Sequence, residues 1–99
     1  MLRDFFVGFV KIHILYHAGE APVYGLELVK ELARHGYQIS PGTLYPTLHN
    51  LEERGYLVGE KRLVEGRWRK YYTLTESGQV ALEEARARIR ELVREVLAE

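Results

Sequence analysis

A short segment in the middle of the chain carries the side chains best suited to binding a polyanion. Residues 54–73 hold six cationic side chains against two carboxylates, although the whole chain has 14 basic and 14 acidic residues and no formal net charge. Because the excess positive charge lies in one stretch, its position matters more than the total. We interpret this stretch as an anion-binding surface; the alternative is an ordinary charged strand exposed to solvent.

The cationic residues coincide with a predicted β-hairpin over residues 56–74, whose turn falls at Glu65 and Gly66. With a two-residue turn, the directly opposed side chains are Arg62 with Arg69 and Lys61 with Lys70. Opposed like charges destabilise a free hairpin by about 0.2–1 kcal/mol for each pair. Such pairs suit a hairpin that binds a polyanion, so we expect the basic wing, residues 60–71, to contact phosphates.

Catalytic and metal-binding motifs are weak in this sequence. The chain has no cysteine, no nucleophile elbow and no glycine-rich phosphate loop. His13 and His17 are spaced i, i+4 and could share a metal ion, but no third ligand lies near them in the sequence. We therefore expect histidines that pack between helices, no metal, no cofactor and no enzymatic activity.

Helices are predicted on both sides of the hairpin, and the first has more apolar surface than a small domain can bury. Residues 2–18 form a helical pattern with two adjacent apolar stripes. The stripes comprise Phe5, Phe9, Ile12 and Tyr16, and Phe6, Val10 and Ile14. We expect part of this helix to pack against another subunit.

Two shorter helices follow and form a helix-turn-helix candidate. The second helix spans about residues 24–35 and ends before Gly36, which can adopt the left-handed conformation of a helix stop. Its expected inward residues are Leu26, Val29, Leu32 and Ala33. The third helix spans about residues 41–54, with Ser40 as the predicted N-cap and Pro41 at the first position. Its expected buried residues are Leu44, Leu48 and Leu51.

The outward face of the third helix is small and uncharged at its start. A helical wheel places Gly42, Pro46, His49 and Glu53 opposite the leucines, Thr43 and Asn50 on one flank, and Tyr45 on the other. Such a face fits a DNA major groove, which is about 12 Å wide. Pro46 lies inside the helix, where it either rigidifies the first turn or marks a functional site.

The last helix, residues 76–99 after a Thr75 cap, carries an apolar seam. The seam consists of Leu82, Ala85, Ile89, Leu92 and Val96, and Val93 widens it. We expect a homodimer in which this seam and Phe5, Phe6 and Phe9 of the first helix form the interface. The alternative is that the seam packs only on its own domain.

The order of elements predicts a mainly α fold with a β-hairpin wing: a winged helix-turn-helix with a long C-terminal helix. We expect residues 1–75 to form the DNA-binding domain and residues 76–99 the dimerisation helix. No apolar run reaches the roughly 18 residues of a membrane span, so we expect a cytoplasmic protein with no membrane partner.

Four segments of the sequence, in the same order, resemble the PadR-like family of transcriptional regulators. They read VYGLEL at residues 23–28, SPGTLYPTL at 40–48, LEERGYL at 51–57 and RKYYTLTESG at 69–78. The resemblance covers about residues 5–82. It implies a homodimeric winged-helix protein that binds double-stranded DNA, usually as a repressor, with dimer contacts from the first and last helices.

The resemblance also assigns DNA contacts, namely Tyr24, Ser40, Thr43, Tyr45, Arg69, Lys70 and Tyr71. The residue patterns add Gly42, Pro46, His49, Asn50, Lys61, Arg62 and Arg67. Some short family members bind flat aromatic drugs between tryptophans of their last helices, whereas Trp68 of this chain lies in the wing. A small-molecule effector is thus left unidentified. The alternative function is a winged-helix module for protein contact or ligand sensing, without specific DNA binding.

Overall fold

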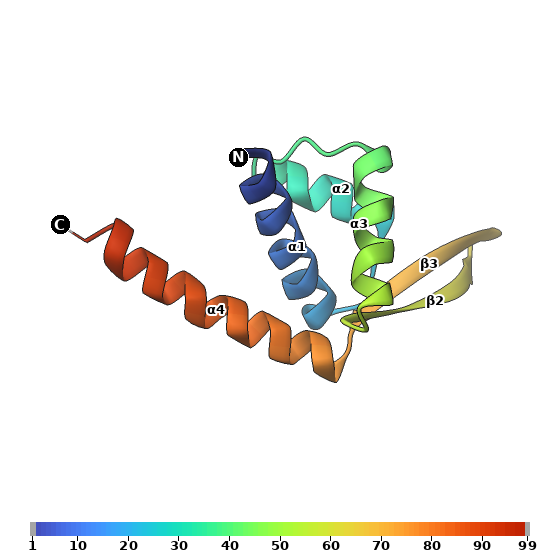
Figure 1. Cartoon of the computed structure of the whole chain (residues 1–99). Coiled ribbons are helices and arrows are strands. Elements are labelled where there is room, and N and C mark those ends of the chain that lie inside the picture. The colour runs from blue at the N-terminus through green and yellow to red at the C-terminus, as the bar shows by residue number, and fades with distance from the viewer. Residues whose placement is uncertain (1, 99) are drawn as a thin grey trace.

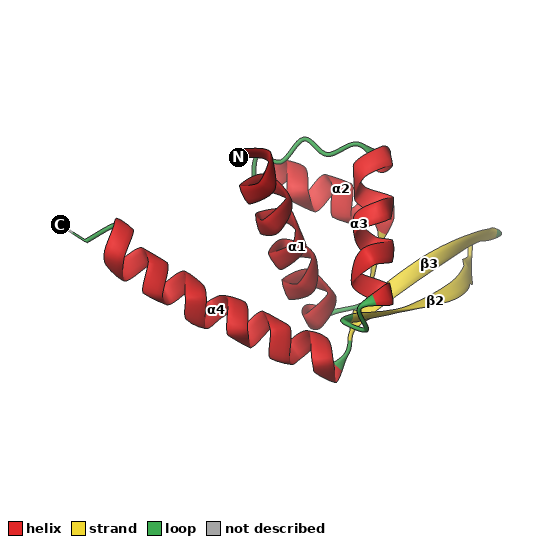
Figure 2. Cartoon of the chain, in the orientation of Figure 1, coloured by secondary structure: helices red, strands yellow, loops and turns green. Residues whose placement is uncertain are grey.

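The computed structural model of the chain describes residues 2–98, which form helices packed beside a small antiparallel sheet (Figure 1; Figure 2). The elements are α1 Leu2–Glu20, β1 Val23–Tyr24, α2 Gly25–Arg34, α3 Pro41–Glu53, β2 Leu57–Val64, β3 Arg67–Leu74 and α4 Glu76–Val96. This order confirms the predicted winged helix-turn-helix with a long C-terminal helix.

The sheet has the strand order β1-β3-β2, and its outer part forms the wing. The hairpin turn uses Glu65 at φ 50° and Gly66 at φ 78°, the left-handed pair that a tight two-residue hairpin turn requires. The predicted register is confirmed, since Lys61 pairs with Lys70 and Arg62 with Arg69. The sequence did not predict β1, whose two residues pair with β3.

The hydrophobic core lies between α1, α2, α3 and the root of the sheet. On α1, Val10 and Ile14 are buried, as are all three leucines expected on α3, Leu44, Leu48 and Leu51. α1 also buries Leu15 and Ala18, whereas Phe5, Phe9 and Tyr16 of the neighbouring apolar stripe are exposed.

The expected inward face of α2 was partly wrong. Leu26 is 55% exposed and Ala33 is also exposed, whereas Leu28 and Leu32 are fully buried. The cause is the pairing of Tyr24 with Tyr71 in the sheet, which fixes the start of α2 and thereby its rotation about its own axis. The buried positions Gly25, Leu28 and Leu32 then follow the helical spacing of three and four residues.

The residues at the helix ends largely match the expectation, with a glycine after α2 and a threonine cap before α4. Gly36 follows α2 with φ at 89°, and its N–H donates to the Ala33 carbonyl. Thr75 caps α4, since its Oγ1 accepts a hydrogen bond of 2.9 Å from the Gly78 N–H. Ser40 immediately precedes α3, but its hydroxyl donates to Thr43 Oγ1 at 3.4 Å instead of capping a backbone N–H.

Thr75 also joins α4 to the end of α3. Its Oγ1 donates to the Gly55 carbonyl at 2.5 Å, and its N–H donates to the Tyr56 carbonyl at 3.1 Å. Gly78 lies against the same Tyr56 carbonyl, so closely that a Cβ at this position would overlap the carbonyl oxygen. The first turn of α4 is therefore fixed to the segment that follows α3 by contacts with the Gly55 and Tyr56 carbonyls.

Beyond this junction α4 packs against α1 through Leu82, and its C-terminal part extends away from the other helices (Figure 1). It ends at Val96, three residues before the expected end, and Glu99 lies outside the described residues. Leu82 packs in the chain's own core at 3% exposure, so its predicted place in a dimer interface is wrong. Among the residues described, no helix is both long and apolar enough to cross a membrane.

Candidate nucleic-acid interface

The face of α3 that points away from the core has the small, uncharged character expected from the sequence. Gly42, Tyr45, Pro46 and His49 are all exposed, whereas Thr43 is half-buried. Asn50 is placed differently, since it is half-buried and its Oδ1 is buried without a hydrogen-bond partner. The first half of α3 is thus the part available to a groove.

Pro46 lies in the interior of α3 without ending the helix. Its ring removes the N–H that would donate to the Gly42 carbonyl one turn earlier. The next residue supplies a local hydrogen bond instead, since Thr47 Oγ1 donates to the Thr43 carbonyl at 2.8 Å. One carbonyl near the exposed start of α3 therefore has no helical donor.

Tyr45 is held against the start of α2. Its side chain is 51% exposed, and its ring covers Gly25 so closely that a Cβ there would lie 2.5 Å from Tyr45 Oη and 2.8 Å from Cε1. Only glycine leaves room for the ring in this position. The close approach fixes Tyr45 between α2 and the wing.

The two pairs of opposed cations, Lys61 with Lys70 and Arg62 with Arg69, lie on opposite faces of the hairpin because neighbouring residues of a strand alternate. Lys61 and Lys70 share the face that turns toward α3. Lys70 Nζ forms an ion pair of 2.8 Å with Glu52 Oε1 of α3, and this hydrogen bond raises the pKa of Lys70. The Lys61–Lys70 pair is therefore partly neutralised within the chain.

The arginine pair on the other face is accommodated by tyrosine rings. The Arg62 guanidinium lies 4.9 Å from the ring centre of Tyr71, and Arg69 lies 4.6 Å from that of Tyr24. Such cation–π contacts stabilise an exposed cation by about 0.5–1 kcal/mol. They position the guanidinium groups without removing their charge.

A surface pocket of about 280 Å³ lies where α2, α3 and β3 meet. Its walls include Tyr24 and Tyr45 together with Arg67, Trp68, Arg69 and Lys70. Arg67 and Lys61 form no ion pair with any described residue, so their charge is free for an external anion. Aromatic walls with cations above them suit a sugar–phosphate backbone.

Sequence reasoning missed Trp68 as a surface residue of this region. Its side chain is 70% exposed, and it pairs across the hairpin with Leu63, which is 59% exposed. The alternation of residues could have located it, because Trp68 shares the strand face of Lys70.

The residues expected in a dimer interface lie on a separate, apolar surface formed by α1 and α4. On α1, Phe5 and Phe9 are about half exposed, and Phe6 makes an edge contact with Tyr37. On α4, the exposed members are Ile89, Leu92, Val93 and Val96, while Ala85 is half-buried. Apart from Leu82, all the expected residues thus retain surface that another chain could cover.

Comparison with known proteins gives a consistent result. The model of the transcriptional regulator PadR-like family matches residues 14–84. Transcriptional regulator Rv3488 of Mycobacterium tuberculosis is 53% identical over 96 residues, which cover 97% of this chain and 90% of that protein.

Solved structures give the same picture. A PadR family transcriptional regulator from Eggerthella lenta superposes with a TM-score of 0.84 at 36% identity, covering 97% of this chain and 85% of the other. A PadR-like transcriptional regulator from Bacillus cereus superposes with a TM-score of 0.77 at 31% identity, covering 93% and 94%.

Proposed function

Because the chain belongs to the PadR-like family of transcriptional regulators, and not to a family of enzymes, we propose that it represses transcription as a homodimer bound to an inverted-repeat operator. Residues 1–75 bind the DNA and residues 76–99 dimerise. α3 enters the major groove and the wing contacts phosphates. This function places the protein in the compartment that holds the DNA, which we propose is the cytoplasm.

The observation that carries this proposal is the placement of free cations around the uncharged first turns of α3. The exposed start of α3, at Gly42 and Pro46, has no carboxylate to repel a phosphate. Arg67 and Arg69 line the adjacent pocket, and the Tyr24 ring positions Arg69. Phosphate contacts from the wing would fix the register of α3 in the groove, where base contacts specify the sequence.

Dimerisation is supported by the uncovered apolar surface of α1 and α4. Phe9 is 48% exposed and Leu92 is 54% exposed, which is costly for large apolar side chains of a small protein in water. A two-fold dimer presents two α3 helices to successive major grooves on one face of the duplex. Two-fold symmetry in the protein predicts an inverted repeat in the operator.

The experiment that tests the proposal is selection of bound duplexes from a random library by the purified protein. We expect an inverted repeat with half-sites about one helical turn, or 34 Å, apart. Affinity for the recovered duplex should fall with salt at a log–log slope of roughly −5 to −7, as for six to eight phosphate contacts. Absence of duplex binding in 50 mM salt contradicts the proposal.

A Thr43→Val variant and the Lys61→Ala variant separate the two parts of the interface. Thr43→Val should change the preferred bases and leave the salt slope unaltered. Lys61→Ala should weaken binding to all duplexes and make the slope shallower by about 1 for each subunit. If both variants changed only the overall affinity, α3 would not be the element that reads sequence.

The exposed Trp68–Leu63 pair favours a second candidate, a protein-contact surface on the wing. In that case the library selection would yield no enriched duplex, and a Trp68→Ser variant would lose a protein partner while any nonspecific DNA binding persisted. Enrichment of an inverted repeat excludes this candidate as the main function.

A further inference from the structure

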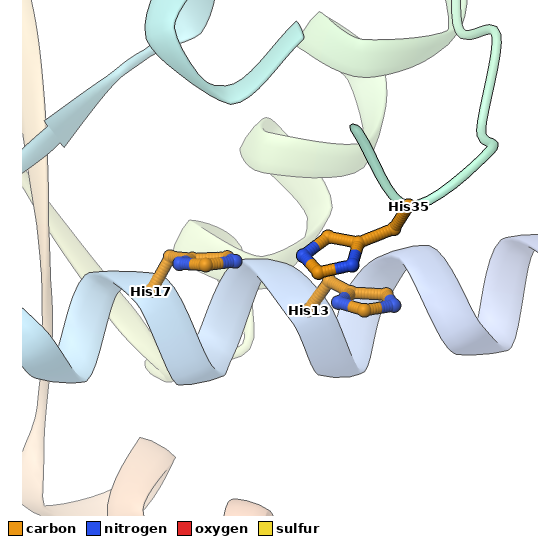
Figure 3. Close-up of side chains that lie close together, drawn as sticks. All are labelled: His13, His17 and His35. Atoms are coloured by element: carbon orange, nitrogen blue, oxygen red, sulfur yellow. The ribbon is translucent and has the colours of Figure 1, made fainter. Parts of the chain in front are cut away.

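Three histidine side chains from two separate segments meet beside α1 (Figure 3). His13 and His17 lie one turn apart on α1, and His35 reaches over them from the residue that follows α2. One ring nitrogen from each histidine lies within 4.8 Å of the other two. The sequence shows only the α1 pair, because folding is needed to bring in His35.

The chain does not provide hydrogen-bond partners for all the nitrogens of this cluster. His17 Nε2 is buried and has no hydrogen-bond partner, which is costly for a buried polar atom. The rings of His13 and His35 are stacked with centres 4.6 Å apart, an arrangement that disfavours protonating both. Burial lowers the pKa of His13, as do the neighbouring His35 and His17, although Glu31 opposes the shift. Neutral imidazoles with free lone pairs are the form that binds metals.

We propose that His13, His17 and His35 bind one divalent transition-metal ion of the zinc type. Imidazole nitrogen is a preferred ligand of Zn²⁺, and three histidines with one open position form a known type of zinc coordination. Two histidines spaced i, i+4 on a helix point to the same side, as such a site requires.

The geometry is close to that of a bound site. Zn–N distances of about 2.0–2.1 Å in a tetrahedron place the nitrogens about 3.3 Å apart, so the rings must approach one another by about 1.5 Å at most. Side-chain rotations of His35, which is 43% exposed, can supply that movement.

Charged neighbours support a cation at this place. Glu31 Oε1 of α2 lies 3.8 Å from His17 Nε2 and 3.7 Å from His35 Nε2, while Arg34 holds the other carboxylate oxygen at 3.3 Å. Glu31 therefore supplies either the fourth ligand or a hydrogen bond that orients a ligand. The cation nearest the cluster on α4, Arg86, is paired with Glu83.

The cluster lines a pocket of about 490 Å³ between α1 and α4. The pocket is also lined by Phe9 of α1 and by Leu82 and Ile89 of α4, so both helices contribute to its walls. A bound ion would tie the end of α2 to α1 at the junction between the DNA-binding domain and the α4 helix. This proposal depends only on the histidine cluster and not on DNA binding.

Zinc titration of the full chain tests the proposal. The protein is stripped with a chelator, returned to pH 7.5 and titrated with Zn²⁺ in a calorimeter. We expect one ion per chain and a rise of several degrees in melting temperature, because a ligand that binds only the folded state stabilises it. Co²⁺ added in place of Zn²⁺ should give the visible absorption of a four-coordinate site.

The decisive variants are His35→Gln and the matched control His49→Gln on α3. His35→Gln should lower zinc affinity at least about tenfold and remove the thermal shift, whereas His49→Gln should change neither. His35 is partly exposed, so its variant remains informative if His17→Gln does not fold. A wild-type chain that binds no zinc, or equal effects of the two variants, would overturn the proposal.

Discussion

The molecule has two uncovered surfaces of opposite character. The surface formed by α3 and the wing is rich in cations and tyrosines, and the surface formed by α1 and α4 is apolar. Although the chain has no net charge, its charges are distributed so that one surface suits a polyanion and the other suits protein.

The two surfaces differ in how far the chain completes them by itself. On the basic surface, Glu52 pairs with Lys70, and tyrosine rings support Arg62 and Arg69. On the apolar surface, no described residue covers the outer face of Leu92 or Val96. The basic surface is therefore arranged before its partner arrives, whereas the apolar surface requires a partner to exclude water.

The largest effect is expected from breaking the apolar surface. Ile89→Glu with Leu92→Glu should dissociate the dimer and lower DNA affinity about a hundredfold or more, because binding loses the benefit of two linked half-sites. Light scattering and fluorescence anisotropy measure the two effects. Val80→Glu, at another exposed apolar position of α4, is the control. A double variant that stays dimeric contradicts the assigned interface.

The next largest effect is expected at the free arginines of the wing. Arg67→Ala with Arg69→Ala should lower DNA affinity about tenfold and make the log–log salt slope shallower by roughly 3 to 4, since a dimer loses four cations. Lys30→Ala with Arg88→Ala removes the same number of charges from α2 and α4. Equal losses in the two variants would indicate that total charge, and not the wing, determines binding.

A smaller effect should follow when Tyr45 is displaced. Gly25→Ala places a methyl group against the Tyr45 ring and should lower DNA affinity about fivefold, which corresponds to about 1 kcal/mol. The control is Gly8→Ala in α1, where an added Cβ meets nothing within 4 Å. Anisotropy titrations compare the two, and an unchanged affinity for Gly25→Ala would show that the position of Tyr45 is unimportant.

The smallest effect on DNA is expected at Lys70, which Glu52 of α3 neutralises. Lys70→Met should lower DNA affinity less than about threefold and reduce the free energy of unfolding by less than about 1 kcal/mol, because the Glu52 pair is partly exposed. Lys61→Met should show the reverse, a larger loss of affinity without a loss of stability. Urea unfolding and anisotropy titrations distinguish the two variants. A greater affinity loss for Lys70→Met than for Lys61→Met would contradict the view that Lys61 is the lysine available to DNA.

Local sequence patterns were sufficient to predict the features that depend on residues close together along the chain. The turn at Glu65 and Gly66 fixed the register of the wing, and the Thr75 cap located the start of α4. The charge of the wing was also visible from the sequence. These features depend on turn and capping chemistry within a few residues.

Features that depend on distant segments could not be predicted in this way. Leu26 and Leu28 both fit a helical apolar stripe on α2, and only the pairing of β1 with β3 decides which of them is buried. The same holds for Lys70, whose partner Glu52 is 18 residues away. The neutralised lysine and the histidine cluster therefore became visible only in the folded chain.

The hydrogen bonds of Thr75 bear on the half-site spacing that the proposed dimer would recognise. Thr75 links the carbonyl of Gly55, just after α3, to the first turn of α4, the helix that we propose forms the dimer. If this link is kept, the distance between the two α3 helices of the proposed dimer would be set by the direction in which α4 leaves the domain. Two related proteins could thus acquire different half-site spacings through changes around this single residue, with both the groove-facing side chains and the dimer contacts preserved.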